Sequence, residues 1–217
     1  MAEVTAQMVK DLRDKTGAGM MDCKQALGES GGDVEKAIEV LRKKGMKNLS
    51  KRAGKVAAEG MVQAYLHPGG RIGVMLELNC ETDFVGRGDD FQALAKDIAM
   101  HVAWANPRFL AREEVPESVL NTERDIYRSQ LQPNQEKMAD KILAGKLEKF
   151  YQENCLLEQL DAKDSSGKKT IQDQINDLSA KVGEKIVLRR FARYEVGEGI
   201  EKQTTDYAAE VEAAARV

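Results

Sequence analysis

The fold is decided by the stretch Met61-Val62-Gln63-Ala64-Tyr65-Leu66-His67-Pro68-Gly69-Gly70-Arg71-Ile72-Gly73-Val74-Met75-Leu76-Glu77-Leu78. Residues 61–66 and 71–78 follow the two-residue period of a β-strand, and the four residues between them are typical of a turn. Every second residue of the later strand is apolar, namely Ile72, Val74, Leu76 and Leu78. The stretch therefore predicts a hairpin with one face toward a core.

The residues before the hairpin follow a helical period instead. Thr5 is a good N-cap for a first helix, which Gly17-Ala18-Gly19 interrupts. A second helix ends at Gly31-Gly32, and a third begins after Asp33 and is predicted to close at Gly45. Each carries an apolar stripe, so residues 4–44 predict a small three-helix bundle.

The residues after the hairpin predict mainly helices. In chain order we expect a helix from Asp89 or Asp90 to Asn106-Pro107, a helix from Pro116 to about Leu131, a helix ending near Asn154, a short strand and polar turn in residues 155–169, a helix from Thr170 to Gly183, a third strand in residues 185–196 and a short helix from Thr205. This order is typical of an α+β protein with a small antiparallel sheet covered by helices.

Composition narrows the class of protein. The chain has 217 residues, 42% hydrophobic residues and a net charge of −3. No apolar run approaches the roughly 20 residues that span a bilayer, and the N-terminus has no basic and apolar secretory signal, so we expect neither a membrane span nor secretion. Three cysteines, Cys23, Cys80 and Cys155, without a Cys-x-x-Cys pair favour a reducing compartment and buried thiols. Two histidines are few for a metal site, and we expect no cofactor.

No catalytic set is found. Residues 17–22 lack the last glycine of a dinucleotide fingerprint, and Ser166-Gly167-Lys168-Lys169-Thr170 lacks the first glycine of a phosphate loop. Nothing in the sequence brings Cys80 and His101 together as nucleophile and base. Binding is therefore favoured over enzymatic activity.

The most unusual segment is Asn79-Cys80-Glu81-Thr82-Asp83-Phe84-Val85-Gly86-Arg87-Gly88. It joins the second strand to the long helix, and its two glycines allow unusual backbone angles. Phe84 and Val85 fit neither apolar period. They either fold back over the sheet edge or project as a wedge, in which case burial of Phe84 by a partner is worth about 1.5–3 kcal/mol.

Four segments carry a resemblance that spans nearly the whole chain. They are residues 78–85 (Leu-Asn-Cys-Glu-Thr-Asp-Phe-Val), residues 12–27, residues 51–60, and Arg189-Arg190-Phe191 with residues 195–202. Together they resemble the translation elongation factor Ts family. One departure is that Gln159 is followed by Leu160-Asp161-Ala162, where the family often has Gln-Pro-Phe.

The resemblance implies a guanine nucleotide exchange factor that binds elongation factor Tu with GDP. In this family the loop that corresponds to Thr82, Asp83, Phe84 and Val85 enters the partner near its magnesium and phosphates. The N-terminal bundle is similar to a ubiquitin-associated domain and docks on the partner, for which Arg13, Met20 and Met21 are weaker candidates. At least one of the two methionines, however, is equally compatible with core packing.

The resemblance also implies how the chain is organised. We expect a bundle in residues 1–45, a basic linker in residues 46–58, a dimerisation core in residues 59–197 and a C-terminal helical module in residues 198–217. Short family members pair two chains, so we expect a homodimer through the sheet around residues 187–194 and a 2:2 complex with elongation factor Tu. The bacterial cytoplasm is the expected location, with an organelle copy as the alternative.

Other interpretations remain open. Seven basic and no acidic residues lie between Arg42 and Lys55, which fits a solvated helix or, alternatively, an RNA-binding module, although no aromatics are interleaved there. A ubiquitin-type binding module built on residues 4–44 is a further alternative. No direct nucleic-acid binding is expected under the exchange-factor interpretation.

Overall fold

The computed structural model describes residues 4–200, apart from the side chains of residues 46–50 and 133. Its helices are α1 (Ala6–Thr16), α2 (Met20–Glu29), α3 (Val34–Arg52), α4 (Asp83–Gly86), α5 (Asp89–Ala105), α6 (Glu117–Ser129), α7 (Ala139–Asn154) and α8 (Ile171–Val182), and its strands are β1 (Glu59–Leu66), β2 (Ile72–Cys80) and β3 (Val187–Glu195). Short 3-10 turns lie at Arg112–Glu114, Pro133–Met138 and Leu156–Glu158. The fold is α+β, as predicted.

The three strands form one antiparallel sheet in the order β1-β2-β3. The hairpin pairs Glu59 with Cys80 at one end and Leu66 with Gly73 at the other. The third strand pairs with β2 from Ile72↔Glu195 to Asn79↔Val187. The predicted hairpin and third strand are thus confirmed.

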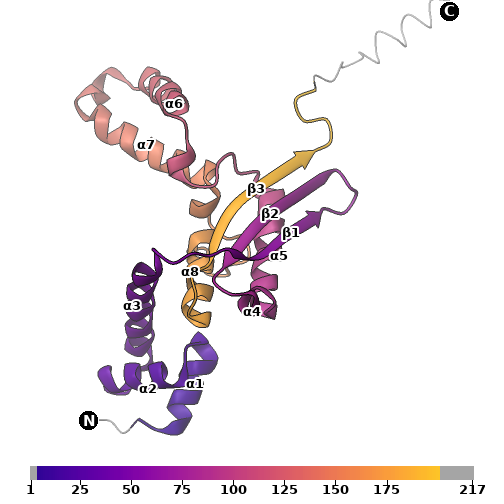
Figure 1. Ribbon diagram of the computed structural model, residues 1–217. Helices are drawn as coiled ribbons and strands as arrows, with labels where there is room; N and C mark the ends of the chain where they lie inside the picture. The colour runs from indigo at the N-terminus through magenta and orange to yellow at the C-terminus, as the bar shows by residue number, and fades with distance from the viewer. Residues whose placement is uncertain (1–3, 201–217) are drawn as a thin grey trace, which may run out of the picture.

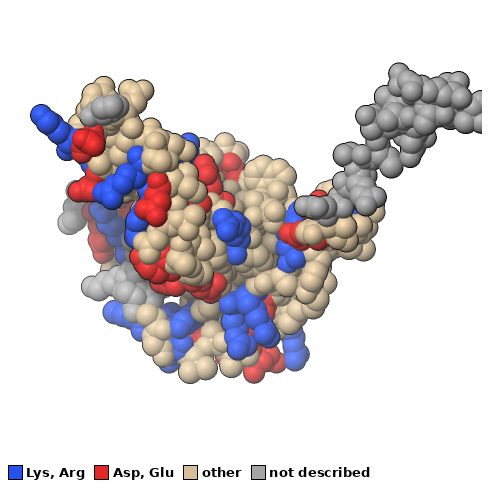
Figure 2. Space-filling model, turned by 90° about the horizontal axis from the view of Figure 1, so that it is seen from above, with Lys and Arg blue, Asp and Glu red and all other residues tan. Residues whose placement is uncertain are grey.

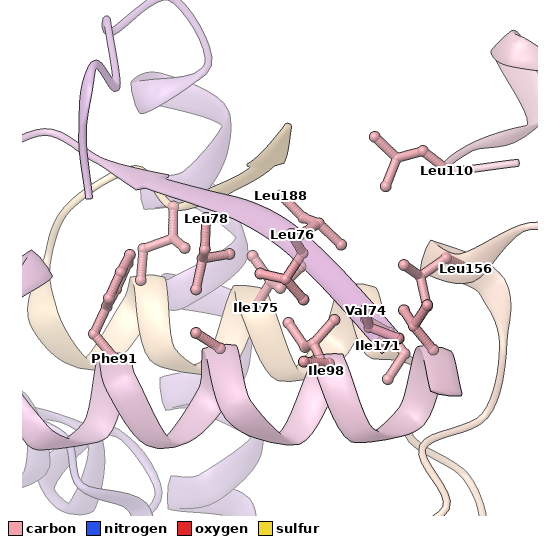
Figure 3. Packing of buried hydrophobic residues seen from close by; sticks show 14 of the residues in the cluster. Val74, Leu76, Leu78, Phe91, Ile98, Leu110, Leu156, Ile171, Ile175 and Leu188 are labelled. Carbon is pink, nitrogen blue, oxygen red and sulfur yellow. The ribbon is translucent and has the colours of Figure 1, made fainter. Parts of the chain in front are cut away.

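The main core lies between one face of the sheet and helices α5 and α8. Figure 3 shows Val74, Leu76 and Leu78 of β2 pointing toward Phe91 and Ile98 of α5. All five are at most 2% exposed, which places the alternating apolar face of the hairpin inside the protein. The opposite face of the sheet has no such cover within residues 4–200 and remains exposed at Val62, Leu66, Met75 and Tyr194.

The N-terminal bundle has a core of its own. Among the described side chains of helices α1, α2 and α3, the buried cluster consists of Val9, Leu12, Cys23, Ala26, Leu27 and Ala37. In Figure 1 the bundle lies at one end of the molecule and the hairpin of α6 and α7 at the other. The three-helix prediction is confirmed, and the arrangement fits a ubiquitin-associated-like bundle.

The third helix is longer than predicted. Gly45 does not close it, and α3 continues to Arg52. A glycine inside a helix costs only about 1 kcal/mol, so flanking helix formers can override it. Here the missing side chain lets α3 approach α8, because a Cβ on Gly45 would lie 3.3 Å from the Cβ of Ala180. Residues 46–52 of the predicted basic linker are therefore helical.

The short strand predicted in residues 155–169 is wrong. The structure has a 3-10 turn at Leu156–Glu158, with isolated bridges from Cys155 to Phe109 and from Leu160 to Thr170. Cys155, Leu156 and Gln159 are buried, a spacing that a strand with alternating faces does not give. The predicted C-terminal helix from Thr205 lies outside the described residues.

Candidate functional site

The predicted projecting loop is a single-turn helix, α4, between β2 and α5. Thr82 is its N-cap, and the Thr82 hydroxyl accepts a hydrogen bond from the backbone N–H of Val85 at 3.4 Å. This satisfies one of the donors that a helix start leaves unpaired. We call Thr82 together with α4 the finger.

Phe84 and Val85 have opposite environments. The side chain of Phe84 is 84% exposed, the most exposed large apolar side chain among the described residues. Val85 is half-buried and packs against the main core. The two alternatives from the sequence are therefore each right for one residue: Val85 anchors the finger, and Phe84 projects.

Asp83 presents a carboxylate beside this ring. It forms an ion pair with Arg87, one helical turn on, at 2.9 Å. Both side chains are more than half exposed, and such pairs are worth about 0–1 kcal/mol, so a partner can replace Arg87 at little cost. The finger thus offers an aromatic ring and an acceptor to a neighbouring molecule.

The glycines of this segment do not adopt unusual backbone angles, and their role is to leave room for close packing. Neither Gly86 nor Gly88 has a positive φ. A Cβ on Gly86 would lie 3.1 Å from the Cα of Gly60, which itself has φ +130 and room for no side chain, with Leu78 O only 2.2 Å from a Cβ position. The absence of side chains at Gly86 and Gly60 lets the finger lie directly on β1.

Three chain segments meet at the base of the finger. The carboxylate of Glu81 accepts hydrogen bonds from the backbone N–H of Lys185 at 2.7 Å and from Arg52 Nη1 at 3.1 Å. Lys185 Nζ in turn donates to the backbone carbonyls of Ala53 and Lys55. The two bonds that Glu81 accepts hold its pKa below its usual value, and the bond from the Lys185 N–H has the larger effect. The end of α3, the finger and the start of β3 are joined here.

Sequence reasoning missed these partners. Thr82 donates to Glu184 from its backbone N–H and its hydroxyl, at 3.0 and 2.7 Å, across a separation of 102 residues. Isolated glutamates in a charged chain carry no local signal for such a role. A single sequence offers nothing that pairs residue 82 with residue 184.

Cys80 takes no part as a nucleophile. Its thiol is buried and donates to the carbonyl of Thr82 at 3.0 Å. Burial raises the pKa of this thiol, and the nearby negative charge of Glu184 raises it further. A high pKa keeps the group a neutral thiol. His101 is engaged elsewhere, with Gln159 at 3.0 Å.

The weaker candidates flank the turn between α1 and α2. Arg13 is exposed, and Met20 and Met21 are 58% and 76% exposed. Neither methionine belongs to the bundle core, which decides against the core alternative. In Figure 1 this turn and α4 both lie toward the same end of the molecule, away from the α6–α7 hairpin.

The basic cluster of residues 42–55 is partly occupied by contacts within the chain. Lys44 Nζ lies 2.7 Å from Asp22 and 2.9 Å from Gln25, and Arg52 is held by Glu81. On the face drawn in Figure 2, Lys and Arg are interspersed with Asp and Glu, and no single sign covers it. None of the described helices is long and apolar enough to cross a membrane.

Comparison with known proteins agrees with the motifs. The family model described as elongation factor TS matches residues 1–168. Proteins named elongation factor Ts from Desulforamulus reducens and Myxococcus xanthus are 57% and 56% identical, over 98% and 97% of both chains. That of Moorella thermoacetica is 60% identical over 91% of this chain and 97% of its own. The chain therefore belongs to the elongation factor Ts family, whose members act in translation elongation.

Proposed function

We propose that this protein is the guanine nucleotide exchange factor of elongation factor Tu, and that the finger promotes release of GDP. The observation that carries the proposal is the exposed ring of Phe84 beside the Asp83 carboxylate, on a helix that the core holds in place. An aromatic side chain that is solvated in the free protein gains about 1.5–3 kcal/mol when a partner buries it.

The proposed mechanism is displacement without covalent chemistry. Magnesium bridges a bound nucleotide's phosphates to its GTPase, so moving the groups that hold the ion weakens nucleotide binding. In this mechanism Phe84 wedges into the partner near the magnesium, and Asp83 accepts hydrogen bonds from the partner's donors. Thr82 and Val85 hold the finger in shape. GTP then binds and the factor leaves.

Docking of the bundle supplies affinity. Met20 and Met21 form an adaptable apolar contact, because the methionine side chain is flexible and polarizable, and Arg13 adds a charge at its edge. Linkage constrains the whole cycle: the factor by which this protein weakens GDP binding equals the factor by which GDP weakens its own binding. The bacterial cytoplasm is where we expect this cycle to run.

We also propose that two chains pair through the open face of the sheet, giving a 2:2 complex with elongation factor Tu. In register across this face lie Ala64, Met75 and Ala192, with Leu66, Gly73 and Tyr194 beside them. Exposed apolar side chains gathered on one sheet face are typical of an interaction surface. Strand β3 forms one side of this face, and its residues 187–194 are the expected centre of the dimer interface.

The test of exchange is release of fluorescently labelled GDP from purified elongation factor Tu. We expect the wild type to accelerate release. In the variant that combines Asp83→Ala with Phe84→Ala, the acceleration should be at least about tenfold smaller, because one buried aromatic anchor is worth about 2 kcal/mol or more. Trp104→Ala is the matched control, because Trp104 is 74% exposed but lies at the far end of α5. No acceleration by the wild type, or unchanged acceleration by the double variant, would contradict the proposal.

A further inference from the structure

Glu184 lies between α8 and β3 and uses both of its carboxylate oxygens on one residue of the finger. Oε2 accepts from the backbone N–H of Thr82 at 3.0 Å, and Oε1 accepts from the Thr82 hydroxyl at 2.7 Å. Hydrogen bonds to an ionised acceptor are stronger than those between neutral groups. The start of α4 is therefore tied to a segment that is 102 residues away in the sequence.

The bond from the hydroxyl also sets the N-cap. A threonine hydroxyl has one proton and two lone pairs. Because its proton points to Glu184, a lone pair is left to accept from Val85 N–H, at 3.4 Å. The carboxylate thus fixes the rotation of the hydroxyl that begins the helix carrying Phe84.

Glu184 is itself held from two sides. Its backbone carbonyl accepts a hydrogen bond from the hydroxyl of Ser179, a residue only 2% exposed. The next residue, Lys185, donates its backbone N–H to Glu81 at 2.7 Å. A side chain on such a fixed backbone can hold the finger in one orientation before any partner arrives.

We propose that Glu184 is a positioning residue for nucleotide exchange, which preorganises the finger so that Phe84 enters the partner without a prior ordering step. This inference rests on the proposed exchange function. Glutamine at this position replaces one of the two acceptor oxygens with an NH2 donor and removes the negative charge, so it cannot reproduce the arrangement in which each Thr82 donor has its own carboxylate oxygen. Preorganisation acts by removing the entropy cost of ordering a segment at the moment of binding.

The experiment compares Glu184→Gln with the wild type in two measurements. The first is the rate of labelled GDP release from elongation factor Tu as a function of the concentration of this protein. We expect the maximal rate to fall about tenfold, as for one lost charge-assisted hydrogen bond, with a smaller change in the half-saturating concentration because the bundle contacts are intact. The second is amide hydrogen exchange of residues 82–88 in the free protein, which we expect to become about tenfold faster.

The control is Glu117→Gln, which removes the same charge from an exposed ion pair with Arg124 on α6. Thr82→Val supplies a second variant: because it removes the same hydroxyl bond, its effect on the maximal rate should not add to that of Glu184→Gln. Thermal unfolding checks that each variant folds.

The outcomes separate the alternatives. Slower GDP release together with faster amide exchange in the finger supports the positioning role. Slower release with unchanged amide exchange would mean that Glu184 touches the partner directly, and unchanged release would mean that its bonds are only structural; either result overturns the inference while the exchange function stands. A wild type that does not accelerate release would refute the exchange function, and the positioning role with it.

Discussion

At the scale of single residues, contacts remote in sequence decide how a side chain behaves. His101 on α5 is only 4% exposed, and its Nε2 lies 3.0 Å from Gln159 Oε1. The amide N–H of Gln159 donates to the carbonyl of Glu153 at 2.8 Å, so the Gln159 oxygen faces the ring. The ring nitrogen Nε2 must then carry the proton, which leaves Nδ1 buried with no partner among the described residues.

This arrangement predicts a pH dependence of stability. Burial lowers the pKa of His101 below its usual 6.5, since a second proton would need an acceptor at Nδ1. The unfolded chain therefore binds more protons than the folded protein just below pH 6.5, and the free energy of unfolding should fall as the pH decreases through this range, then level off below the folded pKa. Urea titrations between pH 7.5 and 5 measure it.

Two variants locate the effect. His101→Asn should remove the slope in this window, whereas His67→Asn should keep it, because His67 is exposed. Hydrogen bonds from Arg189 and Arg190 lower the pKa of Glu77, and the backbone N–H of Lys185 is the main cause of the lowered pKa of Glu81, so these two groups lose their contribution only at lower pH, below about 4.5. A slope that persists in the His101 variant would assign the effect to other groups.

At the scale of elements, the contact between α3 and α8 sets the bundle against the core. Gly45 lies at this contact, since a Cβ there would be 3.3 Å from that of Ala180. Gly45→Leu should improve the helix propensity of α3 by about 0.8 kcal/mol, yet overpack this contact at a cost of about 1–3 kcal/mol. We expect the bundle to stay folded and to loosen from α8, and trypsin to cleave after Lys51, Arg52 and Lys55 more rapidly.

Gly145 on α7 provides the matched control. It also lies inside a helix, but a Cβ there would have no neighbour within 4 Å. Gly145→Leu therefore changes propensity without a clash and should leave the tryptic pattern unchanged. Equal cleavage of the Gly45 variant and the wild type would show that the α3–α8 contact does not restrain the bundle.

At the scale of the whole molecule, the open sheet face should determine the number of chains. Met75 is 52% exposed at the centre of this face, between Ala64 and Ala192. Met75→Glu would place a charge inside the proposed interface, where burial without a partner costs several kcal/mol. Sedimentation at micromolar concentration should show a dimer for the wild type and a monomer for this variant.

Met138→Glu controls for the loss of an exposed methionine. Met138 is 56% exposed but lies just before α7, remote from the sheet, so this variant should remain dimeric. A monomeric wild type, or a dimeric Met75 variant, would rule out pairing through this face. Sedimentation of each form with elongation factor Tu would then distinguish a 2:2 from a 1:1 complex.

The sequence by itself determined the elements whose signals are local. The alternation around Val74 and the caps at Thr5 and Thr170 predicted the hairpin and two helix starts, because side-chain period and capping depend on near neighbours. The candidate site at residues 82–85 was indicated by the resemblance of residues 78–85 to a family motif, not by side-chain period. The helix end predicted at Gly45 and the strand predicted near residue 155 were wrong, because packing against α8 and the burial of Leu156 override local preference.

Only the tertiary structure decided how the finger is held. The exposed Phe84 and the half-buried Val85 are adjacent in sequence and both apolar, and their different environments follow from the contact of the helix with β1 and the core. The bonds from Thr82 to Glu184 and from Arg52 to Glu81 join residues 102 and 29 positions apart. Such pairings depend on how distant segments pack together, a property that no local pattern in a single chain encodes.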